Sequence, residues 1–424
     1  MIYHISGEGQ SGGPGTSRLG ANGERGGVPE EPVAGVARLS GIQNLGNFEF
    51  AMPDLYPLVR PVLRWFPAEA AHAVTLRALE AGLGRFIVDG AARTPDPPVL
   101  TQRLWGLDFP NPVGLAAGYD KDARVPEATR RLGFGFVEIG TVTPRPQPGN
   151  PKPRVFRLEE DQAVVNRMGF NSGGLDIVIA RLSRRSRSGI VGVNLGKNRD
   201  SGDAGADYAV GIRRAARLAD YLVVNISSPN TPGLRELQRR PSLEALLRRL
   251  LQAREESGCR VPLLVKIAPD LAAAERADIA AVALDAQIDG LIVSNTTVDR
   301  PAGLVSRNRR ESGGLSGRPL LAASTAVLAD MYRLTQGRLP LIGVGGIATA
   351  ADAYAKIRAG ASLVQLYTAL VFTGPALVSR IKRGLVDLLE ADGFASITEA
   401  VGTAQEPSVA RSSRDTGHVP KVSA

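Results

Sequence analysis

The sequence has 424 residues but only one cysteine, Cys259, so no disulfide framework and no thiolate metal cluster can form within the chain. It also lacks any apolar run that approaches the roughly 20 residues a helix needs to span a bilayer. The first 25 residues lack the apolar core of a secretory signal peptide. Together these absences predict a protein that is made and folds in the reducing environment of the cytoplasm.

Aromatic residues and lysines are scarce as well. Aromatic side chains make up 5% of the chain, and the net charge of +9 comes mostly from arginine because only seven lysines occur. Nucleic-acid binding would favour aromatic side chains interleaved with the basic ones. A solvated basic surface, or one that faces an anionic membrane, explains the charge more simply. We therefore expect no nucleic-acid partner, and no metal site is predicted.

Composition divides the chain into four parts. Residues 1–51 are rich in glycine, serine and glutamate with little hydrophobic periodicity, so they are expected to form a disordered N-terminal extension. Residues 52–92 are predicted to form an amphipathic helical hairpin, and residues 93–395 the main domain. Residues 396–424 are expected to be a second disordered segment, the C-terminal tail.

The hairpin is predicted from apolar residues at helical spacing. Arg60 and Arg64 fall outside the apolar stripe of the first helix, and Pro67 suits the first turn of a second helix. An apolar stripe that stays exposed suits insertion into the headgroup boundary of a membrane. The stripe of the first helix contains Leu55, Leu58, Val59, Val62, Leu63 and Phe66, and that of the second contains Val74, Leu76, Leu79, Leu83 and Phe86.

From residue 112 onward, eight short apolar runs rich in β-forming residues alternate with longer stretches, several of which show helical periodicity. This alternation predicts an α/β fold with a parallel sheet, and eight units match a closed (β/α)8 TIM barrel. A doubly wound sheet is the alternative, although no GxGxxG turn follows the first run. The predicted strands cover residues 112–118, 136–142, 190–195, 221–227, 262–267, 290–295, 341–347 and 363–368.

Each predicted strand ends in polar residues or glycine. In a closed parallel barrel the carboxyl ends of all strands open on one face, where barrel enzymes place their active sites. Residues that are far apart in the sequence should therefore meet there, which predicts an enzyme. Lys121, Lys197 and Lys266 lie at or beside such strand ends, where a compact ammonium group can reach a flavin or a carboxylate.

Glycines after the seventh predicted strand indicate a phosphate site. Gly343, Gly345 and Gly346 would expose backbone N–H groups, and a helix that begins near Gly374 and Pro375 would add its positive end. The alternative is that these glycines serve only tight turns. Their position after strands seven and eight of a barrel favours the phosphate site.

Six motifs occur one after another along the chain. They are Asn111–Lys121, Gly140–Asn150, Asn166–Asn171, Asn225–Arg235, Gly313–Pro319 and Ile342–Ile347. A single motif of this kind is a weak signal, but the ordered set closely resembles the dihydroorotate dehydrogenases. The resemblance extends from about residue 53 to about residue 390.

That family has a soluble class and a quinone-linked class, and the resemblance is to the quinone-linked class. Ser228 stands where the soluble class typically has a catalytic cysteine, and Cys259 lies ahead of the fifth strand, at the wrong end of the barrel. The N-terminal hairpin matches the family's element for membrane docking and quinone access. The resemblance implies a monomer, bound peripherally to the cytoplasmic face of the cell membrane, with a ubiquinone-type quinone as electron acceptor.

The resemblance further implies that FMN is the cofactor and that dihydroorotate is oxidised to orotate in pyrimidine biosynthesis, with Ser228 as the base. Thr368 is a departure, since serine is common there, but either residue offers a hydroxyl. The residues implied to line FMN are Ala117, Gly118, Tyr119, Asp120, Lys121, Thr141, Asn194, Asn225, Lys266, Ser294, Gly317, Gly346, Tyr367 and Thr368. Those implied to hold dihydroorotate are Lys121, Asn166, Arg167, Met168, Gly169, Phe170, Asn225, Asn230, Asn295 and Thr296. His72 and Arg157 match positions near the quinone passage.

Other interpretations stay open at this point. One is another FMN barrel oxidoreductase that acts on a different small carboxylate. Another is a barrel that binds a phosphate ligand, or a membrane scaffold, without redox activity. His72 in particular could equally be a solvated helix residue.

Overall fold

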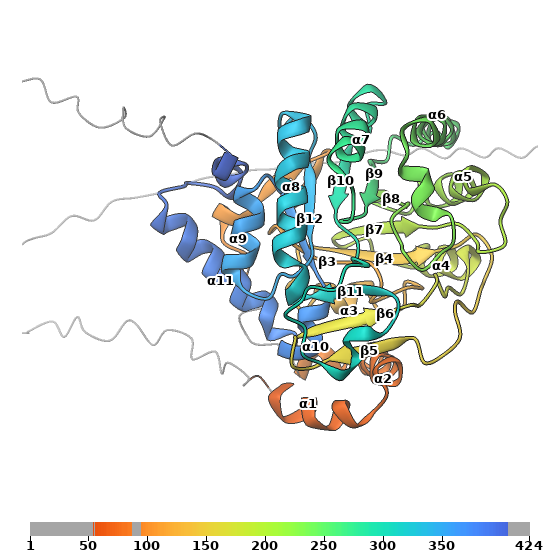
Figure 1. Cartoon of the computed structure of the whole chain (residues 1–424). Coiled ribbons are helices and arrows are strands. Elements are labelled where there is room, and N and C mark those ends of the chain that lie inside the picture. Colours follow the sequence, from red (N-terminus) through yellow and green to blue (C-terminus); the bar gives the residue numbers. More distant parts are fainter. Residues whose placement is uncertain (1–53, 55, 87–94, 406–424) are drawn as a thin grey trace, which may run out of the picture. The chain divides into compact units, whose positions relative to one another are not determined.

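The computed structural model describes residues 54, 56–86 and 95–405, which all belong to one compact unit. Eight parallel strands form a closed barrel, which confirms the predicted (β/α)8 fold (Figure 1). Their hydrogen-bonded order around the barrel is β10-β12-β13-β3-β4-β7-β8-β9. The strands are β3 (Val113–Leu115), β4 (Phe136–Val142), β7 (Ile190–Leu195), β8 (Tyr221–Asn225), β9 (Leu263–Ile267), β10 (Gly290–Val293), β12 (Leu341–Val344) and β13 (Leu363–Leu366).

Helices alternate with the strands and pack around the barrel (Figure 1). Helical periodicity sets their buried faces: in α6 (Arg240–Glu256), Leu243, Leu247 and Leu250 are buried in the core. The other helices of the barrel are α3 (Pro126–Arg130), α4 (Leu175–Leu182), α5 (Ala204–Ala215), α7 (Ala273–Asp285), α8 (Leu321–Thr335), α9 (Ala350–Arg358), α10 (Thr368–Thr373) and α11 (Ala376–Ala391).

Large apolar side chains fill the half of the barrel interior nearest the N-terminal ends of the strands. Phe136 and Tyr221 are the first residues of β4 and β8, and both are fully buried. Glycines on neighbouring strands make room for them. A Cβ on Gly114 would lie 2.3 Å from the Phe136 ring, and a Cβ on Gly192 would lie 2.1 Å from the Tyr221 ring. This half of the barrel is therefore packed core rather than a binding site.

A short antiparallel hairpin closes that end of the barrel. Its strands, β1 (Gln102–Leu104) and β2 (Leu107–Phe109), are joined by Trp105 and Gly106, whose φ angles of 55° and 79° suit a tight hairpin turn. The Phe109 ring packs edge-on against the first phenylalanine of β4, with 5.4 Å between the ring centroids. The sequence did not predict this hairpin, because three-residue strands are too short to show a period.

A second small sheet lies at the C-terminal end of the barrel, next to the helical hairpin (Figure 1). It is antiparallel, has the order β11-β6-β5, and consists of β5 (Val155–Leu158), β6 (Ala163–Asn166) and β11 (Gly314–Gly317). This sheet was not predicted either. Ser316 of β11 pairs with Val164 of β6, which lies 152 positions earlier, and no local pattern links segments so far apart.

The predicted helical hairpin is present as α1 (Tyr56–Trp65) and α2 (Ala68–Glu80). The second helix is shorter than its apolar pattern suggested, because a separate 3-10 helix follows at Leu83–Phe86. Pro67 lies immediately before α2, at its N-cap position, instead of within its first turn. Leu55, which was assigned to the first apolar stripe, lies outside the described residues.

Ion pairs and apolar contacts tie the hairpin to the barrel. Glu69 of α2 contacts the guanidinium of Arg154 at two points, at 2.6 and 3.1 Å. Glu80 contacts Arg124 in the same way, at 2.6 and 2.7 Å. Leu76 of α2 is buried in the main core. The hairpin is therefore an integral part of the folded unit.

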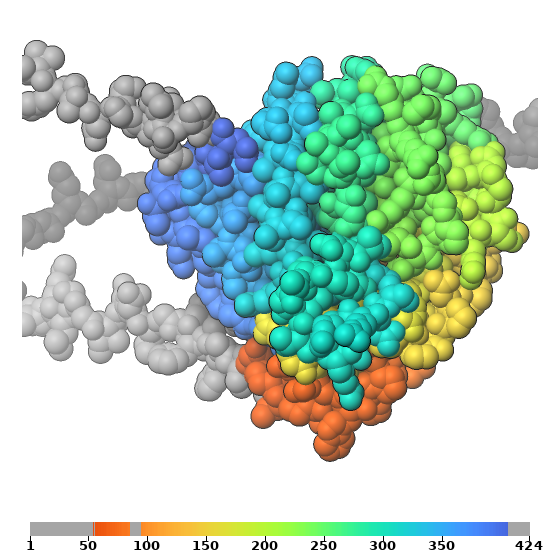
Figure 2. All heavy atoms as spheres, in the orientation of Figure 1, coloured from red at the N-terminus to blue at the C-terminus, as the bar shows by residue number. Residues whose placement is uncertain are grey.

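Much of the apolar surface of the hairpin is nevertheless exposed. Trp65 is 86% exposed and Leu58 is 75% exposed, and Val62 and Phe66 are also exposed. In Figure 2 the atoms of the hairpin form the lower margin of the folded unit, next to those of β5 and of the segment that precedes β11. Within the ranges that the structure describes, no helix combines the length and the apolar character needed to cross a membrane.

The folded part reaches further towards the C-terminus than expected. The tail was expected to begin at residue 396, but the following residues form two 3-10 helices, Ile397–Ala400 and Thr403–Gln405. The side chains of Ile397 and Ala400 are fully buried because they pack into the main core. The rest of the expected tail, residues 406–424, lies outside the described residues, as does the expected N-terminal extension.

Candidate active site

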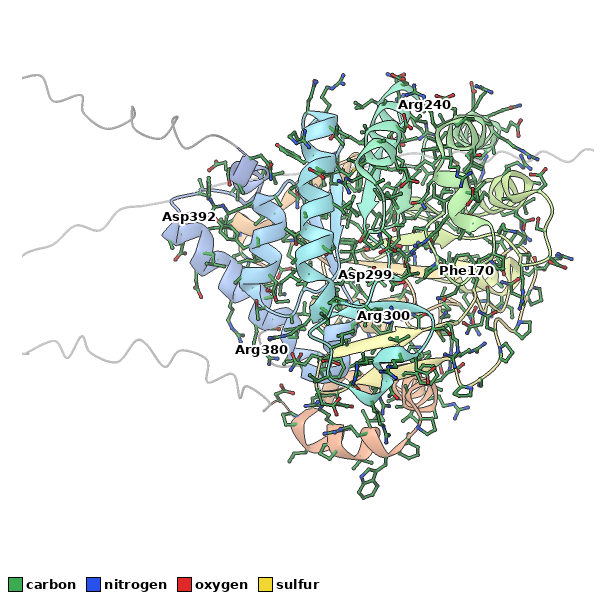
Figure 3. The ribbon with its side chains drawn as sticks, in the orientation of Figure 1. Phe170, Arg240, Asp299, Arg300, Arg380 and Asp392 are labelled. Carbon is green, nitrogen blue, oxygen red and sulfur yellow. The ribbon has the colours of Figure 1, made fainter. Side chains whose placement is uncertain are left out.

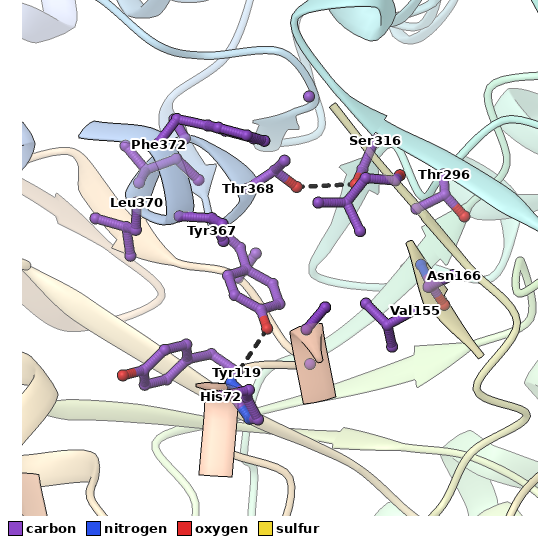
Figure 4. Close-up of a pocket in the computed structure, with 18 of the residues that line it drawn as sticks. His72, Tyr119, Val155, Asn166, Thr296, Ser316, Tyr367, Thr368, Leu370 and Phe372 are labelled. Atoms are coloured by element: carbon purple, nitrogen blue, oxygen red, sulfur yellow. Dashed lines mark hydrogen bonds between the residues drawn. The ribbon is translucent and has the colours of Figure 1, made fainter. Parts of the chain in front are cut away.

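A cavity of about 430 Å³ lies at the C-terminal end of the barrel (Figure 4). Its lining comes from the ends of the barrel strands, from the β5–β6–β11 sheet, and from helices α1 and α2. Its size is ordinary for a small-molecule site. The predicted site residues that line it are His72, Ala117, Gly118, Tyr119, Lys121, Thr141, Arg157, Asn166, Met168, Gly169, Phe170, Asn225, Ser228, Asn230, Lys266, Ser294, Asn295, Thr296, Gly317, Gly346, Tyr367 and Thr368.

A buried carboxylate lies below the floor of this cavity. Glu138 of β4 is inaccessible to solvent and accepts three hydrogen bonds. The donors are Gln365 Nε2 at 2.7 Å, Asn194 Nδ2 at 2.8 Å and the Tyr221 hydroxyl at 3.3 Å. The two oxygens of the Glu138 side chain thus serve as acceptors for three donors that come from β7, β8 and β13.

Asn194 connects this carboxylate to the cavity. Its side-chain oxygen accepts from Thr141 Oγ1 at 2.6 Å and from Asn225 Nδ2 at 3.3 Å, and Asn225 Nδ2 also donates to Thr141 Oγ1 at 3.0 Å. Thr141 and Asn225 line the cavity, whereas Asn194 lies behind them. Asn194 was predicted to line FMN. It is not among the residues that line the cavity, and its hydrogen bonds orient two residues that are.

Lys266 brings a buried positive group to the barrel side of the cavity. It lies on β9 and is 5% exposed. Burial lowers the pKa of Lys266, and the carboxylate of Glu138 opposes that shift. The floor of the cavity thus presents the amine of Lys266, and the carboxylate of Glu138 lies behind the residues that line the cavity.

Ser228 lies in the loop that follows β8 and is 7% exposed. Its Oγ accepts a hydrogen bond from the backbone N–H of Asn230 at 3.3 Å. Among the described residues no imidazole or carboxylate forms a hydrogen bond with this hydroxyl. Cys259, the alternative nucleophile, is half-buried ahead of β9, at the opposite end of the barrel.

Four asparagine side chains line the same part of the cavity. Asn230 Nδ2 donates to the backbone carbonyl of Asn166 at 3.1 Å and to its side-chain oxygen at 3.3 Å. Asn295 Nδ2 donates to Ser227 Oγ at 2.9 Å and to Asn225 Oδ1 at 3.2 Å. These mutual contacts fix the amide directions, so the remaining donors and acceptors can be presented to a small polar ligand.

Lys121 adds a cation to this amide cluster. Its Nζ donates to Asn171 Oδ1 at 2.9 Å. Burial lowers the pKa of Lys121 to about 8, and the nearby positive charge of Arg154 adds to the shift, while Asp122 and Glu69 oppose it. A cation beside several fixed amides can hold a planar acid with ring carbonyls.

A glycine-rich wall lies at another side of the cavity. A Cβ on Gly346 would come within 2.5 Å of the backbone of Leu321, and a Cβ on Gly317 within 2.4 Å of the Gln162 carbonyl oxygen. Only glycine fits such close approaches, which bring backbone to the cavity surface. Beside these glycines, Thr368 Oγ1 donates to a serine of β11 at 2.8 Å. Backbone and hydroxyl groups of this kind can hold a phosphate.

Part of the predicted phosphate cradle lies elsewhere. Gly343 does not line the cavity, because it faces Leu328 and Lys356 on the outside of β12. The helix predicted near Gly374 begins at Ala376 as α11, and Gly374 packs against the hairpin, where a Cβ would lie 2.3 Å from the ring of Tyr56. The helix that starts beside the cavity is α10, which directly follows the end of β13.

His72 of α2 lies between two tyrosines at the hairpin side of the cavity (Figure 4). Its ring packs edge-on against Tyr119, with 5.1 Å between centroids, and its Nδ1 lies 3.4 Å from the Tyr367 hydroxyl. Burial lowers the pKa of His72 to about 4, and the positive charge of Lys121 adds to the shift. The imidazole is therefore neutral at physiological pH and belongs to the cavity wall, which rules out a freely solvated helix residue.

Arg157 of β5 lines the cavity and also caps helix α1. Its guanidinium donates to the carbonyl oxygens of Leu63, Arg64 and Phe66 at 3.1 to 3.3 Å. These are carbonyl groups at the C-terminal end of α1, where a positive charge also opposes the negative end of the helix dipole. Arg157 thus fixes the position of α1 over the cavity.

Two other predicted site residues lie behind the cavity wall. Asp120 is fully buried, and its carboxylate accepts the backbone N–H groups of Arg124 and Val125 at 2.8 and 2.7 Å. It shapes the loop after β3. Arg167 points away from the cavity: it pairs with Glu311 at 2.6 Å, and its guanidinium lies 4.5 Å above the Phe156 ring.

Lys197, the third lysine placed at a strand end, does not line the cavity either. Its Nζ donates to the carbonyl oxygen of Ser201 at 3.2 Å, within the loop that follows β7. Of the three lysines grouped from the sequence, only Lys121 and Lys266 therefore reach the site.

Phe170 and Arg300, both labelled in Figure 3, belong to loops that are held by internal hydrogen bonds. Phe170 adopts a left-handed backbone with a φ of 55°, and Gln147 Nε2 donates to its carbonyl at 2.9 Å. Arg300 closes the loop between β10 and β11 by donating to the carbonyl oxygens of Glu311 and Gly313 at 2.7 and 2.8 Å. The site is thus held together by contacts outside the cavity as well as within it.

Glu138 and Gln365 were not predicted from the sequence, although both belong to the polar floor. A signal was available, because alternate residues of a strand face the barrel interior. Glu138 lies two positions after Phe136, and Gln365 lies two positions after Leu363, and both of these apolar residues are interior. A polar residue in register with an interior apolar residue would have identified each of them.

Comparison with known proteins identifies the family of this chain independently of the geometry of the site. The family model described as dihydroorotate dehydrogenase matches residues 99–389. A relative from Xanthobacter autotrophicus, named dihydroorotate dehydrogenase (quinone), is 58% identical over 356 residues, which is 82% of this chain and 99% of the relative. A relative of the same name from Parvibaculum lavamentivorans is 59% identical over 351 residues, which is 82% of this chain and 98% of the relative.

Solved structures agree with the sequence relatives. The ligand-free DHODH from Eimeria tenella has 44% sequence identity and a TM-score of 0.75, and the match covers 80% of this chain and 100% of that chain. The DHODH from the same organism in complex with ferulenol has 45% identity and a TM-score of 0.75, and this match covers 80% of this chain and 96% of that chain.

Proposed function

This chain belongs to the dihydroorotate dehydrogenase family, and we propose that it oxidises dihydroorotate to orotate and passes the electrons to a membrane quinone, as a step of pyrimidine biosynthesis. One observation carries the proposal. A single cavity joins an amide-and-lysine pocket around Ser228, a glycine-rich wall, and a passage lined by the helical hairpin. We also propose that the protein works as a monomer.

FMN is the proposed cofactor, and the residues present fit it. The wall around Gly317 and Gly346 has no room for side chains and offers backbone groups and hydroxyls to a phosphate, while Lys266 offers a buried cation. When bound, FMN accepts a hydride from the substrate and passes the electrons to the quinone. The residues that would hold it are Ala117, Gly118, Tyr119, Thr141, Asn225, Lys266, Ser294, Gly317, Gly346, Tyr367 and Thr368.

Ser228 is the proposed base. Oxidation of dihydroorotate removes a proton from one ring carbon and a hydride from its neighbour, and the Ser228 hydroxyl lies in the pocket that would hold the ring. Serine is a weak base, and the one hydrogen bond of its Oγ in the described part of the chain comes from a backbone N–H. We infer that the proton leaves through water, because none of the described side chains accepts a hydrogen bond from this hydroxyl.

The substrate would be held by charge and amide contacts. Lys121 lines the cavity beside the asparagine side chains, so its positive charge would bind the carboxylate of dihydroorotate. The amides of Asn166, Asn230 and Asn295 would bind the ring carbonyl and N–H groups, since amides both donate and accept. Their mutual hydrogen bonds keep them in place before the substrate arrives.

The hairpin would provide quinone access and membrane docking. Its inner side lines the cavity with Val59, Leu63 and the neutral His72, which suit an uncharged apolar molecule. Its exposed side presents Leu58 and Trp65, which suit insertion into the headgroup boundary. We place the protein on the cytoplasmic face of the cell membrane, with a ubiquinone-type quinone as acceptor.

Anaerobic titration of the purified protein tests this function. Addition of dihydroorotate should bleach the flavin absorbance, and a subsequent addition of a soluble ubiquinone analogue should restore it. A flavin that stays oxidised with dihydroorotate but is reduced by another small carboxylate would point to a different substrate. A colourless protein that cannot be reconstituted with FMN would exclude the proposed redox activity altogether.

A further inference from the structure

A lysine is buried behind the glycine-rich wall of the cavity, and none of the roles assigned so far uses it. Lys356 lies on α9 and is fully inaccessible to solvent. Its Nζ donates to Ser324 Oγ at 2.8 Å and to Thr325 Oγ1 at 3.0 Å, both on α8. Burial lowers the pKa of Lys356 to about 7. Even as a neutral amine it keeps two N–H donors, which is the number these contacts need.

The two hydroxyls relay this contact to backbone carbonyls. A hydroxyl has one proton, so a hydroxyl that accepts from the amine donates its own proton elsewhere. Thr325 Oγ1 donates to the Leu321 carbonyl at 2.7 Å. Ser324 Oγ lies 3.1 Å from that carbonyl and 3.1 Å from the carbonyl of Gly345. Of the two hydroxyls, only that of Ser324 reaches the Gly345 carbonyl among the contacts of the described residues, so Ser324 is the link between the amine and this carbonyl.

This relay fixes the direction of one peptide unit at the cavity wall. The Gly345 carbonyl points towards α8, and in a trans peptide the N–H of the next residue points the opposite way. The N–H of Gly346 is thereby turned away from α8 and towards the cavity, which Gly345 and Gly346 both line. In the described part of the chain neither this N–H nor that of Ile347 has a hydrogen-bond acceptor.

Helix α9 holds the other end of the same loop as well. The carboxylate of Asp352, one turn before Lys356, accepts the backbone N–H groups of Ala348 and Thr349 at 3.0 and 2.9 Å. Asp352 therefore serves the loop rather than forming an ion pair with the lysine. Two residues of one helix thus hold the two ends of residues 345–349.

We propose that Lys356 is a positioning residue for anion recognition: through Ser324 it orients the Gly345–Gly346 peptide so that an N–H group faces the phosphate of the bound ligand. The inference rests on the proposed function, because FMN is the phosphate ligand in question. Packing alone does not explain the amine. A buried cation without a carboxylate partner is costly, and an apolar side chain of similar length would fill the same space more favourably.

Binding of FMN and riboflavin to the apoprotein tests this role, because riboflavin lacks only the phosphate. Dissociation constants would be measured by quenching of flavin fluorescence for the wild type, Lys356→Met and Ser324→Ala. In both variants the preference for FMN over riboflavin should fall by about tenfold, the effect of losing roughly one well-placed hydrogen bond to a charged group. The affinity for riboflavin should stay within about twofold of the wild type.

Lys382→Met provides a matched control. Lys382 is also a buried lysine, but it pairs with Asp96 at 2.6 Å and does not line the cavity. Its replacement should lower thermal stability and leave the preference for FMN unchanged. If Lys356→Met does not fold, Ser324→Ala still cuts the relay while leaving the lysine in place.

Two results would overturn the inference alone: an unchanged preference for FMN in Ser324→Ala and Lys356→Met, or equal weakening of FMN and riboflavin, which indicates a merely structural role. A wild-type apoprotein that binds neither flavin would overturn the proposed function together with this inference. The two failures are therefore distinguishable in one set of titrations.

Discussion

Within the described residues, the hydroxyl of Ser228 forms one hydrogen bond, with the backbone N–H of Asn230, so its removal disturbs no side-chain network. In Ser228→Ala the reduction of FMN by dihydroorotate should slow by about 10²- to 10⁴-fold, the usual contribution of a general base. Anaerobic stopped-flow absorbance measures this half-reaction.

The same variant contains its own control. It should retain bound flavin, and reoxidation of the reduced protein by a quinone analogue should proceed at the wild-type rate, because Ser228 has no part in that half-reaction. Reduction by dihydroorotate at near wild-type rate would show that another group removes the proton.

Lys121 gives substrate binding a pH dependence. With its pKa near 8 in the free protein, Lys121 is charged below that pH and loses its charge as the pH rises through it. The dissociation constant of the anionic product orotate should therefore increase above pH about 8, by up to about tenfold per pH unit. Titration of the flavin spectrum with orotate between pH 6 and 10 measures it.

Lys121→Arg is the matched variant, because a guanidinium stays charged throughout this range. Its affinity for orotate should be lower, since the shape of the head group differs, but the affinity should not vary with pH in the same way. Parallel pH profiles for the wild type and Lys121→Arg would assign the titration to another group.

At the scale of single residues, the sequence predicted correctly which segments reach the site. It was less successful in predicting which side chains of those segments point into the cavity. Asp120 follows the strand end as predicted, yet its carboxylate turns back to bind two N–H groups of its own loop. Arg167 has neighbours on both sides that line the cavity, yet it stacks on Phe156. The direction of a loop side chain depends on the folded path of its own loop, as for Asp120, or on contacts with another segment, as for Arg167, and hydrophobic periodicity records neither.

At the scale of elements, two of the ion pairs that hold α2 to the barrel, Glu69–Arg154 and Glu80–Arg124, differ in burial. The side chain of Arg154 is 6% exposed and that of Glu69 is 24% exposed, whereas those of Arg124 and Glu80 are 26% and 39% exposed. Loss of a buried partner leaves a charge that water reaches poorly. Glu69→Gln should therefore lower the free energy of unfolding by about 1–3 kcal/mol.

Glu80→Gln serves as the comparison for Glu69→Gln. It breaks a contact of the same geometry in a more exposed place, so it should cost less than about 1 kcal/mol. Urea denaturation of both variants measures the difference. Equal effects of the two substitutions would mean that burial does not govern how strongly the hairpin is held.

The elements themselves were predictable where a local period exists. All eight barrel strands fall within the predicted runs, because each run is apolar and bounded by polar or glycine residues. The β5–β6–β11 sheet was out of reach, since Ser316 and Val164 pair across 152 positions. The position of the site at the C-terminal end of the barrel could therefore be predicted from the sequence. The part of the cavity wall that the β5–β6–β11 sheet forms could not.

At the scale of the whole molecule, membrane docking should depend on the exposed apolar side chains of the hairpin. Leu58 and Trp65 are 75% and 86% exposed, and neither lines the cavity. The double variant Leu58→Ser/Trp65→Ser should bind anionic phospholipid vesicles at least about tenfold more weakly, because each side chain contributes roughly 1.5–3 kcal/mol on burial. Co-sedimentation measures this.

A control variant and an activity assay complete that experiment. Ile177→Ser/Val210→Ser removes two exposed apolar side chains from the barrel helices α4 and α5 and should leave vesicle binding unchanged. Reduction of a soluble quinone analogue should be normal in both double variants, since the cavity is untouched. Equal loss of vesicle binding in the two would show that the hairpin is not the docking element.

The hairpin formed by β1 and β2 contributes to the stability of the barrel at the end opposite the cavity. Trp105 of this hairpin donates its indole N–H to the backbone carbonyl of Asp289 at 2.6 Å. Phe136, Tyr221 and their apolar neighbours fill the barrel interior between the hairpin and the polar residues below the cavity. None of the described residues of β1 and β2 lines the cavity, so substitutions there can be selected for heat tolerance alone. Directed evolution for higher thermal stability can therefore begin with this hairpin, because substitutions there should leave the kinetic constants unchanged.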